Sequence, residues 1–180
     1  MSSDSDCLFV ITGKSTLIEA LGAEGFAHSA EADRALIRDQ VAIGGRALPW
    51  ADPHAFAELM LSWEMRSWHM ARDRAGPVFF DRGVPDVVGY RRLMGLPVPA
   101  HMDKAARTFR YNRRVFMAPP WPEIFTQDAE RKQTFEEAEP TFQAMVEAWA
   151  AYSNELVPRC RGRACGSSVS GWRSWPFESG

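Results

Sequence analysis

A lysine and two hydroxyl side chains follow the first apolar segment of the chain, in an order that suits phosphate binding. Residues 8–11 form a short apolar run that leads into Thr-Gly-Lys-Ser-Thr at 12–16. The run predicts a buried parallel strand, and the residues after it predict the start of a helix. Amides at a helix N-terminus bind anions, a lysine ammonium can reach the outer phosphates, and a serine hydroxyl can coordinate magnesium. We therefore expect a nucleotide site made by Gly13, Lys14, Ser15 and Thr16, with Ser15 as a metal ligand and Lys14 as a catalytic group.

This phosphate-binding motif is incomplete. The full pattern places a glycine five residues before the Gly-Lys pair, and in this chain that position is Leu8, inside the apolar run. The loop is thus expected to be short by about five residues and to lack amides that normally cradle the β-phosphate. Ordinary nucleotide affinity does not follow from such a motif.

A carboxylate and an arginine follow a second apolar run. Residues 78–80 predict a strand buried on both faces, and Asp81-Arg82-Gly83 comes directly after them. A carboxylate at this place can hold magnesium or accept a proton from an attacking hydroxyl, so we expect Asp81 to be catalytic and a metal ligand. Arg82 is expected to contact the nucleotide; alternatively, Asp81 caps a turn and pairs with Arg82. For Asp86, a helix-capping role is favoured over a substrate contact.

A polar segment precedes the last long helix. Residues 119–123 are Pro-Pro-Trp-Pro-Glu, and residues 128–132 are Asp-Ala-Glu-Arg-Lys. Such a segment suits a lid that closes over phosphates and delivers Arg131 to the charge that develops during transfer. The alternative is a capped, solvated helix start with no role in catalysis.

Strands and helices are predicted to alternate along the chain. We expect strands at 8–11, 26–29, 78–80, 115–117 and 156–157, and helices at 15–24, 32–43, 53–74, 86–94, 99–110 and 135–152, the last kinked at Pro140. Gly25 predicts the end of the first helix, and Asp52-Pro53 the start of the third. This alternation predicts an α/β fold of three layers, a parallel sheet of about five strands with helices on both faces. Such sheets bind ligands beyond the carboxyl ends of their strands.

Four stretches carry a family resemblance: Phe-Val-Ile-Thr-Gly-Lys-Ser-Thr at 9–16, Val-Phe-Phe-Asp-Arg-Gly at 78–83, Ala-Pro-Pro-Trp at 118–121, and residues 128–137. Together they resemble a family of small bacterial predicted ATPases of the AAA type, close in build to nucleotide and small-molecule kinases. The resemblance covers about residues 8–158. It implies a P-loop NTPase fold, ATP and magnesium bound at Lys14, Ser15, Thr16 and Asp81, and a lid arginine at Arg131. The chain departs from the family in its short phosphate loop, in Pro140, and in a tail that replaces the closing strand and helix.

The net charge and the apolar content of the chain argue against a membrane or a nucleic acid as a partner. The 180 residues have a net charge of −2, and no apolar window is long enough for a membrane helix. The N-terminus is acidic, unlike a signal peptide, and we expect no membrane partner. The three cysteines, Cys7, Cys160 and Cys165, are an odd number at spacings that do not suit disulfides, so we expect a cytoplasmic protein. The overall charge argues against nucleic acid. The arginines at 107, 110, 113 and 114 predict salt bridges that anchor a helix more readily than an RNA site.

The last 22 residues differ from the rest. Residues 159–180 are rich in Gly, Ser and Arg and have no apolar repeat, so we divide the chain into a P-loop NTPase-like domain at 1–158 and a flexible tail at 159–180. Trp172, Trp175 and Phe177 leave a binding role for the tail open. Cys160 and Cys165 have no further ligands nearby that would complete a zinc site.

Taken together, the residues predict an ATP-binding P-loop protein with magnesium as cofactor. Its reaction is expected to be ATP hydrolysis or kinase-like transfer of the γ-phosphoryl group to an unknown small-molecule acceptor. The alternative is a non-catalytic P-loop remnant that acts as an interaction module.

Overall fold

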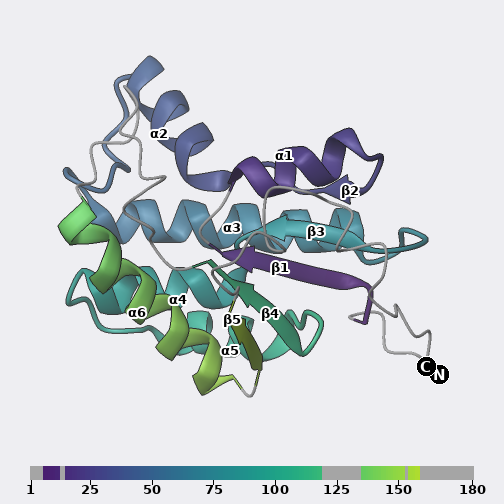
Figure 1. Cartoon of the computed structure of the whole chain (residues 1–180). Helices are drawn as coiled ribbons and strands as arrows, with labels where there is room; N and C mark the ends of the chain where they lie inside the picture. The colour runs from purple at the N-terminus through teal and green to yellow at the C-terminus, as the bar shows by residue number, and fades with distance from the viewer. Residues whose placement is uncertain (1–5, 13–14, 119–134, 153, 159–180) are drawn as a thin grey trace.

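The computed structural model describes residues 6–12, 15–118, 135–152 and 154–158 (Figure 1). These residues form five strands and six helices. The strands are β1 (Leu8–Thr12), β2 (Ala27–His28), β3 (Val78–Asp81), β4 (Arg114–Met117) and β5 (Glu155–Pro158). The helices are α1 (Ser15–Ala23), α2 (Ala32–Ala42), α3 (Pro53–Ala71), α4 (Val84–Leu93), α5 (Ala100–Thr108) and α6 (Phe135–Ala151). Every element predicted from the sequence is therefore confirmed.

The sheet is parallel throughout, with the strand order β2-β3-β1-β4-β5. β1 lies at the centre, between β3 and β4, so the chain crosses from one side of β1 to the other after β3. In such sheets the crevice at the carboxyl ends of the strands, where the order reverses, is where ligands bind. The register brings Asp81 beside Ile11 and Met117 beside Thr12. The end of β1 and the end of β3 thus meet at this edge.

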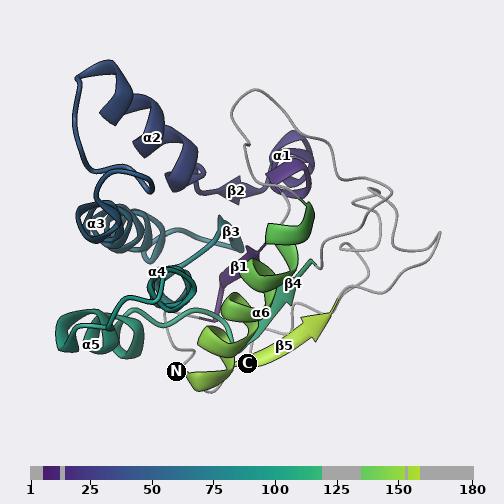
Figure 2. The same cartoon turned by 90° about the vertical axis from the view of Figure 1, so that its left-hand side faces the viewer.

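Helices cover both faces of the sheet, as the alternation of elements predicts (Figure 2). On one face Val10, Phe80 and Met117 pack against Met145 and Trp149 of α6. The other face packs its apolar side chains on α1, with Ile11, Phe79 and Phe116 against Leu17, Ile18 and Leu21. Strand β3 is buried on both faces, which explains why 78–80 is an uncharged run. No helix in the described part of the chain is long and apolar enough to cross a membrane.

The predicted helix signals are present at the predicted places. Asp52 accepts a hydrogen bond from the Ala55 amide at 3.0 Å and Pro53 is the first residue of α3, so the start of α3 is confirmed. Gly25 follows α1 with φ +88°, a conformation that glycine adopts without strain. Helix α6 includes Pro140.

Helices α4 and α6 approach closely at Gly89. A Cβ at this position would lie 2.8 Å from the sulfur of Met145 and 3.1 Å from the carbonyl oxygen of Ala144. Because glycine has no side chain, α6 can lie directly against α4. This contact places Trp149 of α6 at the start of α4, where it reaches the functional edge of the sheet.

Candidate functional site

Asp81 lies at the carboxyl end of β3, in the position that the sequence predicts for a functional carboxylate. It is 5% exposed and stands beside Ile11, the residue before the end of β1. Its backbone amide donates to the hydroxyl oxygen of Ser29 at 3.1 Å, and the Ser29 amide donates to the carbonyl oxygen of Phe79. The segment after β2 thus holds the end of β3 in place.

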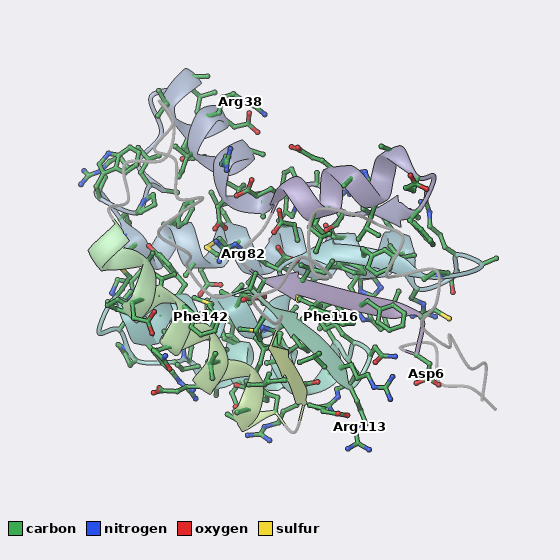
Figure 3. All side chains as sticks on the ribbon, in the orientation of Figure 1. Asp6, Arg38, Arg82, Arg113, Phe116 and Phe142 are labelled. Carbon is green, nitrogen blue, oxygen red and sulfur yellow. The ribbon has the colours of Figure 1, made fainter. Side chains whose placement is uncertain are left out.

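Arg82 adopts a backbone conformation that is uncommon for a residue with a side chain. Its φ is +86°, and it is the one described residue other than glycine with a positive φ. The guanidinium Nε pairs with the carboxylate of Asp33 at 3.1 Å, so a residue of α2 holds Arg82 in this conformation (Figure 3). The ion pair that Arg82 forms is thus with Asp33 and not with its neighbour Asp81, although the charge of Asp81 also raises the pKa of Arg82. Strained backbone of this kind is concentrated at functional sites.

Five acidic side chains surround Arg82, and we call them the carboxylate cluster: Glu31, Asp33, Glu64, Asp81 and Asp86. Asp33 has the largest effect on Arg82 and raises the pKa of its guanidinium above the ordinary value, against the opposing effect of burial. Glu31 also pairs with Arg34 at 3.1 Å. Because two arginines face five carboxyl groups, the cluster keeps an excess of negative charge whenever its members are ionised.

Glu64 is a buried member of the cluster for which the described residues provide no hydrogen-bond or ion-pair partner. It lies on α3, is 3% exposed, and makes no hydrogen bond or ion pair with any described residue. Burial raises the pKa of its carboxyl well above the ordinary value, and the charges of Asp86 and Asp33 raise it further. Burial likewise raises the pKa of Glu31, followed by the effect of Asp81. The site therefore contains carboxyl groups that resist ionisation.

Asp86 connects three elements at this edge through hydrogen bonds. Its Oδ1 accepts from the hydroxyl of Thr12 at 3.2 Å, and its Oδ2 accepts from the Gly83 amide at 2.8 Å and from the indole of Trp149 at 3.1 Å. Burial raises its pKa to about 6, although Arg82 and these hydrogen bonds act in the opposite direction. The capping role expected for Asp86 is confirmed, and this cap explains why α4 begins at Val84, two residues earlier than predicted.

Gly83 is required at this turn by close packing. A Cβ there would lie 2.9 Å from Cζ of Tyr111 and 3.2 Å from Cη2 of Trp149. Both rings are buried, and the Tyr111 hydroxyl accepts a hydrogen bond from the Val84 amide at 3.3 Å. The two rings therefore fix the turn that carries Asp81 and Arg82 from one side, while Asp86 fixes it from the other.

The structure brings some of the predicted site residues together and leaves others undescribed. Ser15 and Thr16 begin α1, and only residues 13 and 14 separate this helix from β1. Asp81 and Arg82 lie at the same edge of the sheet. Gly13, Lys14 and Arg131 lie outside the described residues, as do the predicted lid at 119–132 and the tail with Cys160 and Cys165.

Three members of the carboxylate cluster were not predicted from the sequence: Glu31, Asp33 and Glu64. Glu64 does have a sequence signal. It continues the spacing of Phe56 and Met60, which are buried positions of α3 four residues apart, so it places an acid on the buried face of a helix. Such a residue is worth inspecting as a functional candidate. Asp33 has no comparable signal, because its role depends on how α2 packs on α3.

The residues at the carboxyl ends of β1 and β3 fit a magnesium ion. Magnesium prefers oxygen ligands and is commonly held by one or two carboxylates together with substrate phosphates and water. Asp81 could supply one such oxygen, and Ser15 lies at the start of the neighbouring helix. Within the described residues, no group of three acidic, histidine or cysteine side chains is arranged to hold a metal without further ligands.

Two of the four arginines at 107, 110, 113 and 114 form ion pairs with described residues. Arg107 pairs with Asp103 one helical turn earlier at 2.9 Å, and its guanidinium lies over the ring of Tyr152. Arg114 reaches Glu155 of the neighbouring strand at 4.0 Å. For these two residues, the expected anchoring by salt bridges is confirmed.

Residues 12–163 match the family of AAA domains. This match spans most of the chain, and the parallel sheet of order β2-β3-β1-β4-β5 with helices on both faces is the α/β fold of P-loop NTPases. The protein belongs to the AAA domain family, and its class is that of nucleotide-binding P-loop proteins. No curated protein matches the chain.

Proposed function

We propose that this protein binds magnesium-ATP at the start of α1 and transfers the γ-phosphoryl group to a small acceptor or to water. The observation that carries the proposal is the placement of Asp81. Its carboxylate is buried at the end of β3, directly beside the strand that leads into Lys14, Ser15 and Thr16. A phosphate on the N-terminus of α1 would thus have a carboxylate nearby that can orient a metal ion or accept a proton.

Each proposed residue has a separate task. The amide of Gly13, the ammonium of Lys14 and the hydroxyls of Ser15 and Thr16 bind the phosphates, and magnesium neutralises phosphate charge when it is bound. Asp81 holds the metal through its oxygens or receives the proton of the attacking hydroxyl. Arg82 has donors besides the Nε that pairs with Asp33, and offers them to a phosphate. Arg131 stabilises the transferred group from the lid.

A second candidate function is a P-loop remnant that serves as an interaction module. It is favoured by the position of Leu8, where the full phosphate motif has a glycine. Leu8 is 1% exposed and pairs with Val78 within the sheet, so it belongs to a strand and cannot contribute amides to a loop. The two residues between β1 and α1 leave few backbone amides for a β-phosphate. The enzyme and the remnant differ in turnover, which an assay of phosphate release measures directly.

Calorimetric titration with magnesium-ATP tests nucleotide binding. We expect saturable heat for the parent protein and an affinity at least tenfold lower for Lys14→Ala, since a hydrogen bond to a charged group contributes about 1.5–3 kcal/mol. The matched control is Lys104→Ala, which removes an exposed lysine of α5 and should leave the affinity unchanged. The negative charge of the carboxylate cluster repels the triphosphate of ATP unless magnesium neutralises part of the phosphate charge. Chelation of magnesium should therefore weaken ATP binding strongly.

Two results would contradict the proposed site. One is the absence of heat, and of competition by ADP, at millimolar nucleotide. The other is an equal affinity for ATP in the Lys14→Ala and Lys104→Ala variants. The nucleotide would then bind away from Lys14.

A further inference from the structure

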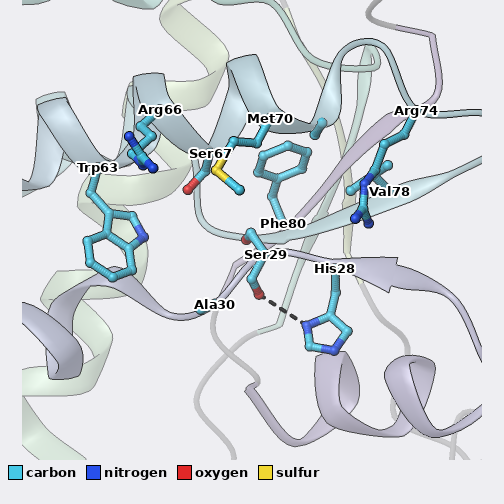
Figure 4. Close-up of a pocket in the computed structure, with 11 residues that line it drawn as sticks. His28, Ser29, Ala30, Trp63, Arg66, Ser67, Met70, Arg74, Val78 and Phe80 are labelled. Atoms are coloured by element: carbon cyan, nitrogen blue, oxygen red, sulfur yellow. Dashed lines mark hydrogen bonds between the residues drawn. The ribbon is translucent and has the colours of Figure 1, made fainter.

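A pocket lies on the face of the sheet opposite α1, between the segment that follows β2 and the helix α3 (Figure 4). Its volume is about 260 Å³. The lining residues that matter here are Trp63, Arg66, Met70 and Arg74 from α3 and the turn after it, and Val78 and Phe80 from β3. The nucleotide site proposed above uses none of these side chains.

The apolar part of the lining comes from one face of α3. Trp63 and Met70 are seven residues apart, so they lie on the same side of the helix, and Ser67 lies between them. Met70 is 67% exposed, so its side chain is available to a ligand. Val78 and Phe80, which are buried, close the bottom of the pocket, so the apolar surface that is open to water belongs to Trp63 and Met70. An apolar ligand would remove this surface from water.

The charged part of the lining is exclusively positive. Arg66 and Arg74 stand at its two ends in Figure 4, and the described residues that line the pocket include no acid. Neither guanidinium has a hydrogen bond or ion pair with a described residue. Arg72 and Arg82, by contrast, pair with Asp73 and Asp33. As far as the described residues go, the pocket therefore offers guanidinium donors to an anion beside an apolar surface.

His28 does not compete for this space. Its ring is turned toward α1, where a Cβ at Gly22 would lie 2.5 Å from Nε2, and its Nδ1 lies 3.2 Å from the carbonyl oxygen of Ser29. Figure 4 shows the ring directed away from Trp63 and Met70. The imidazole of His28 therefore lies at the margin of the pocket, away from Trp63 and Met70.

We propose that this pocket binds a small planar aromatic anion, a carboxylate or a phosphate monoester. The ring lies against Trp63 and Met70, which contact it through their apolar surfaces, and the anionic group is bound by Arg66 or Arg74. The volume of about 260 Å³ is slightly below the usual range of about 300–1,000 Å³ for ligand sites, so the pocket suits one or two fused rings and is too small for a whole nucleotide.

An occupant of this pocket would touch the backbone that carries the candidate active site. Ala30, Trp63 and Phe80 line the pocket, and each immediately precedes a member of the carboxylate cluster. Ser29, also in the lining, accepts the hydrogen bond from the Asp81 amide. The two sites are therefore adjacent along the chain.

Titration with three naphthalene probes tests the proposal. 2-Naphthoate and 2-naphthyl phosphate carry the two candidate anionic groups, and neutral 2-naphthol has the same rings without charge. We expect at least one of the anions to bind with an affinity ten or more times that of 2-naphthol. The anion that binds more tightly identifies the group that the arginines recognise.

Variants locate the binding. Arg66→Gln combined with Arg74→Gln should weaken anion binding at least tenfold, whereas Arg38→Gln combined with Arg113→Gln removes the same charge from exposed positions outside the pocket and should have no effect. Met70→Glu, at an exposed position, should abolish anion binding while the protein stays folded. Lys14→Ala should leave it unchanged, so this test is independent of the nucleotide site.

Three results would overturn the proposal. The first is that neither anion binds at a concentration of about 10 mM, which is above the dissociation constants of weak ligands. The others are equal affinity for 2-naphthol and the anions, and anion binding that the Arg66 and Arg74 substitutions do not alter.

Discussion

Replacing Asp86 by alanine is expected to lower the free energy of unfolding by about 3 kcal/mol or more. The carboxylate accepts hydrogen bonds from Thr12, Gly83 and Trp149, and Asp86 is fully buried. Without it, three buried donors would lose their acceptor, and each unsatisfied group costs about 1–3 kcal/mol, although such costs do not add fully. Chemical denaturation monitored by circular dichroism measures the change.

Asp86→Asn is the matched control, because it keeps most of the hydrogen bonds and removes the charge. The amide oxygen can accept from Gly83 and Trp149, and the amide nitrogen can donate to the hydroxyl of Thr12. We expect this variant to be far more stable than Asp86→Ala at pH 7. Equal loss of stability in the two variants would contradict the role assigned to the hydrogen bonds.

The same pair gives a dependence on pH. The pKa of Asp86 is raised from 3.8 to about 6 in the folded state. A raised carboxyl pKa means that the folded state binds the proton more tightly, so the contribution of Asp86 to stability falls as the pH rises from about 4 to about 6, and is then constant. The full change corresponds to about 3 kcal/mol. Asp86→Asn should therefore gain stability relative to the parent protein across this range, and a constant difference would contradict the assigned pKa.

Removing the charge of Arg82 is the second substitution with a large expected effect. Arg82→Gln should lower the free energy of unfolding by about 3 kcal/mol at pH 8, the cost of leaving buried charges without their partner. Arg82 lowers the pKa of Glu31, Glu64 and Asp86, so without it these pKa values rise further above their ordinary values. The penalty is then present at high pH and shrinks as the pH falls toward 5 and the carboxyl groups become protonated.

Arg82→Lys is the control for this substitution, since it keeps a positive charge and has the same backbone strain at φ +86°. It should retain most of the stability at pH 8, apart from the geometry of the Asp33 pair. Thermal unfolding of both variants at pH 5 and pH 8 makes the comparison. A loss of stability in Arg82→Gln that is the same at both pH values would show that charge in the carboxylate cluster is not the cause.

The sequence predicted the elements well because their signals are local. Apolar runs such as 78–80 mark strands that are covered on both faces, and Asp52-Pro53 and Gly25 mark helix ends through their own backbone preferences. Asp81 and Arg82 could be predicted as candidates by one general rule, that parallel sheets present their functional residues after the strands.

The contacts of the site could not be predicted because they join distant parts of the chain. Asp86 is 74 residues from Thr12 and 63 residues from Trp149. Arg82 has a positive φ and pairs with Asp33 of α2. Neither feature has a signal in the residues around Arg82. Glu64 is the exception, since an acid in the apolar stripe of α3 already indicates an unusual environment.

The most direct test of the nucleotide site is a crystal structure of the protein with magnesium-ATP or a non-hydrolysable analogue. We expect phosphates on the N-terminus of α1, within hydrogen-bond distance of Ser15, with a metal ion between the phosphates and Asp81. A nucleotide bound away from the ends of β1 and β3, with the start of α1 free of phosphate, would contradict it.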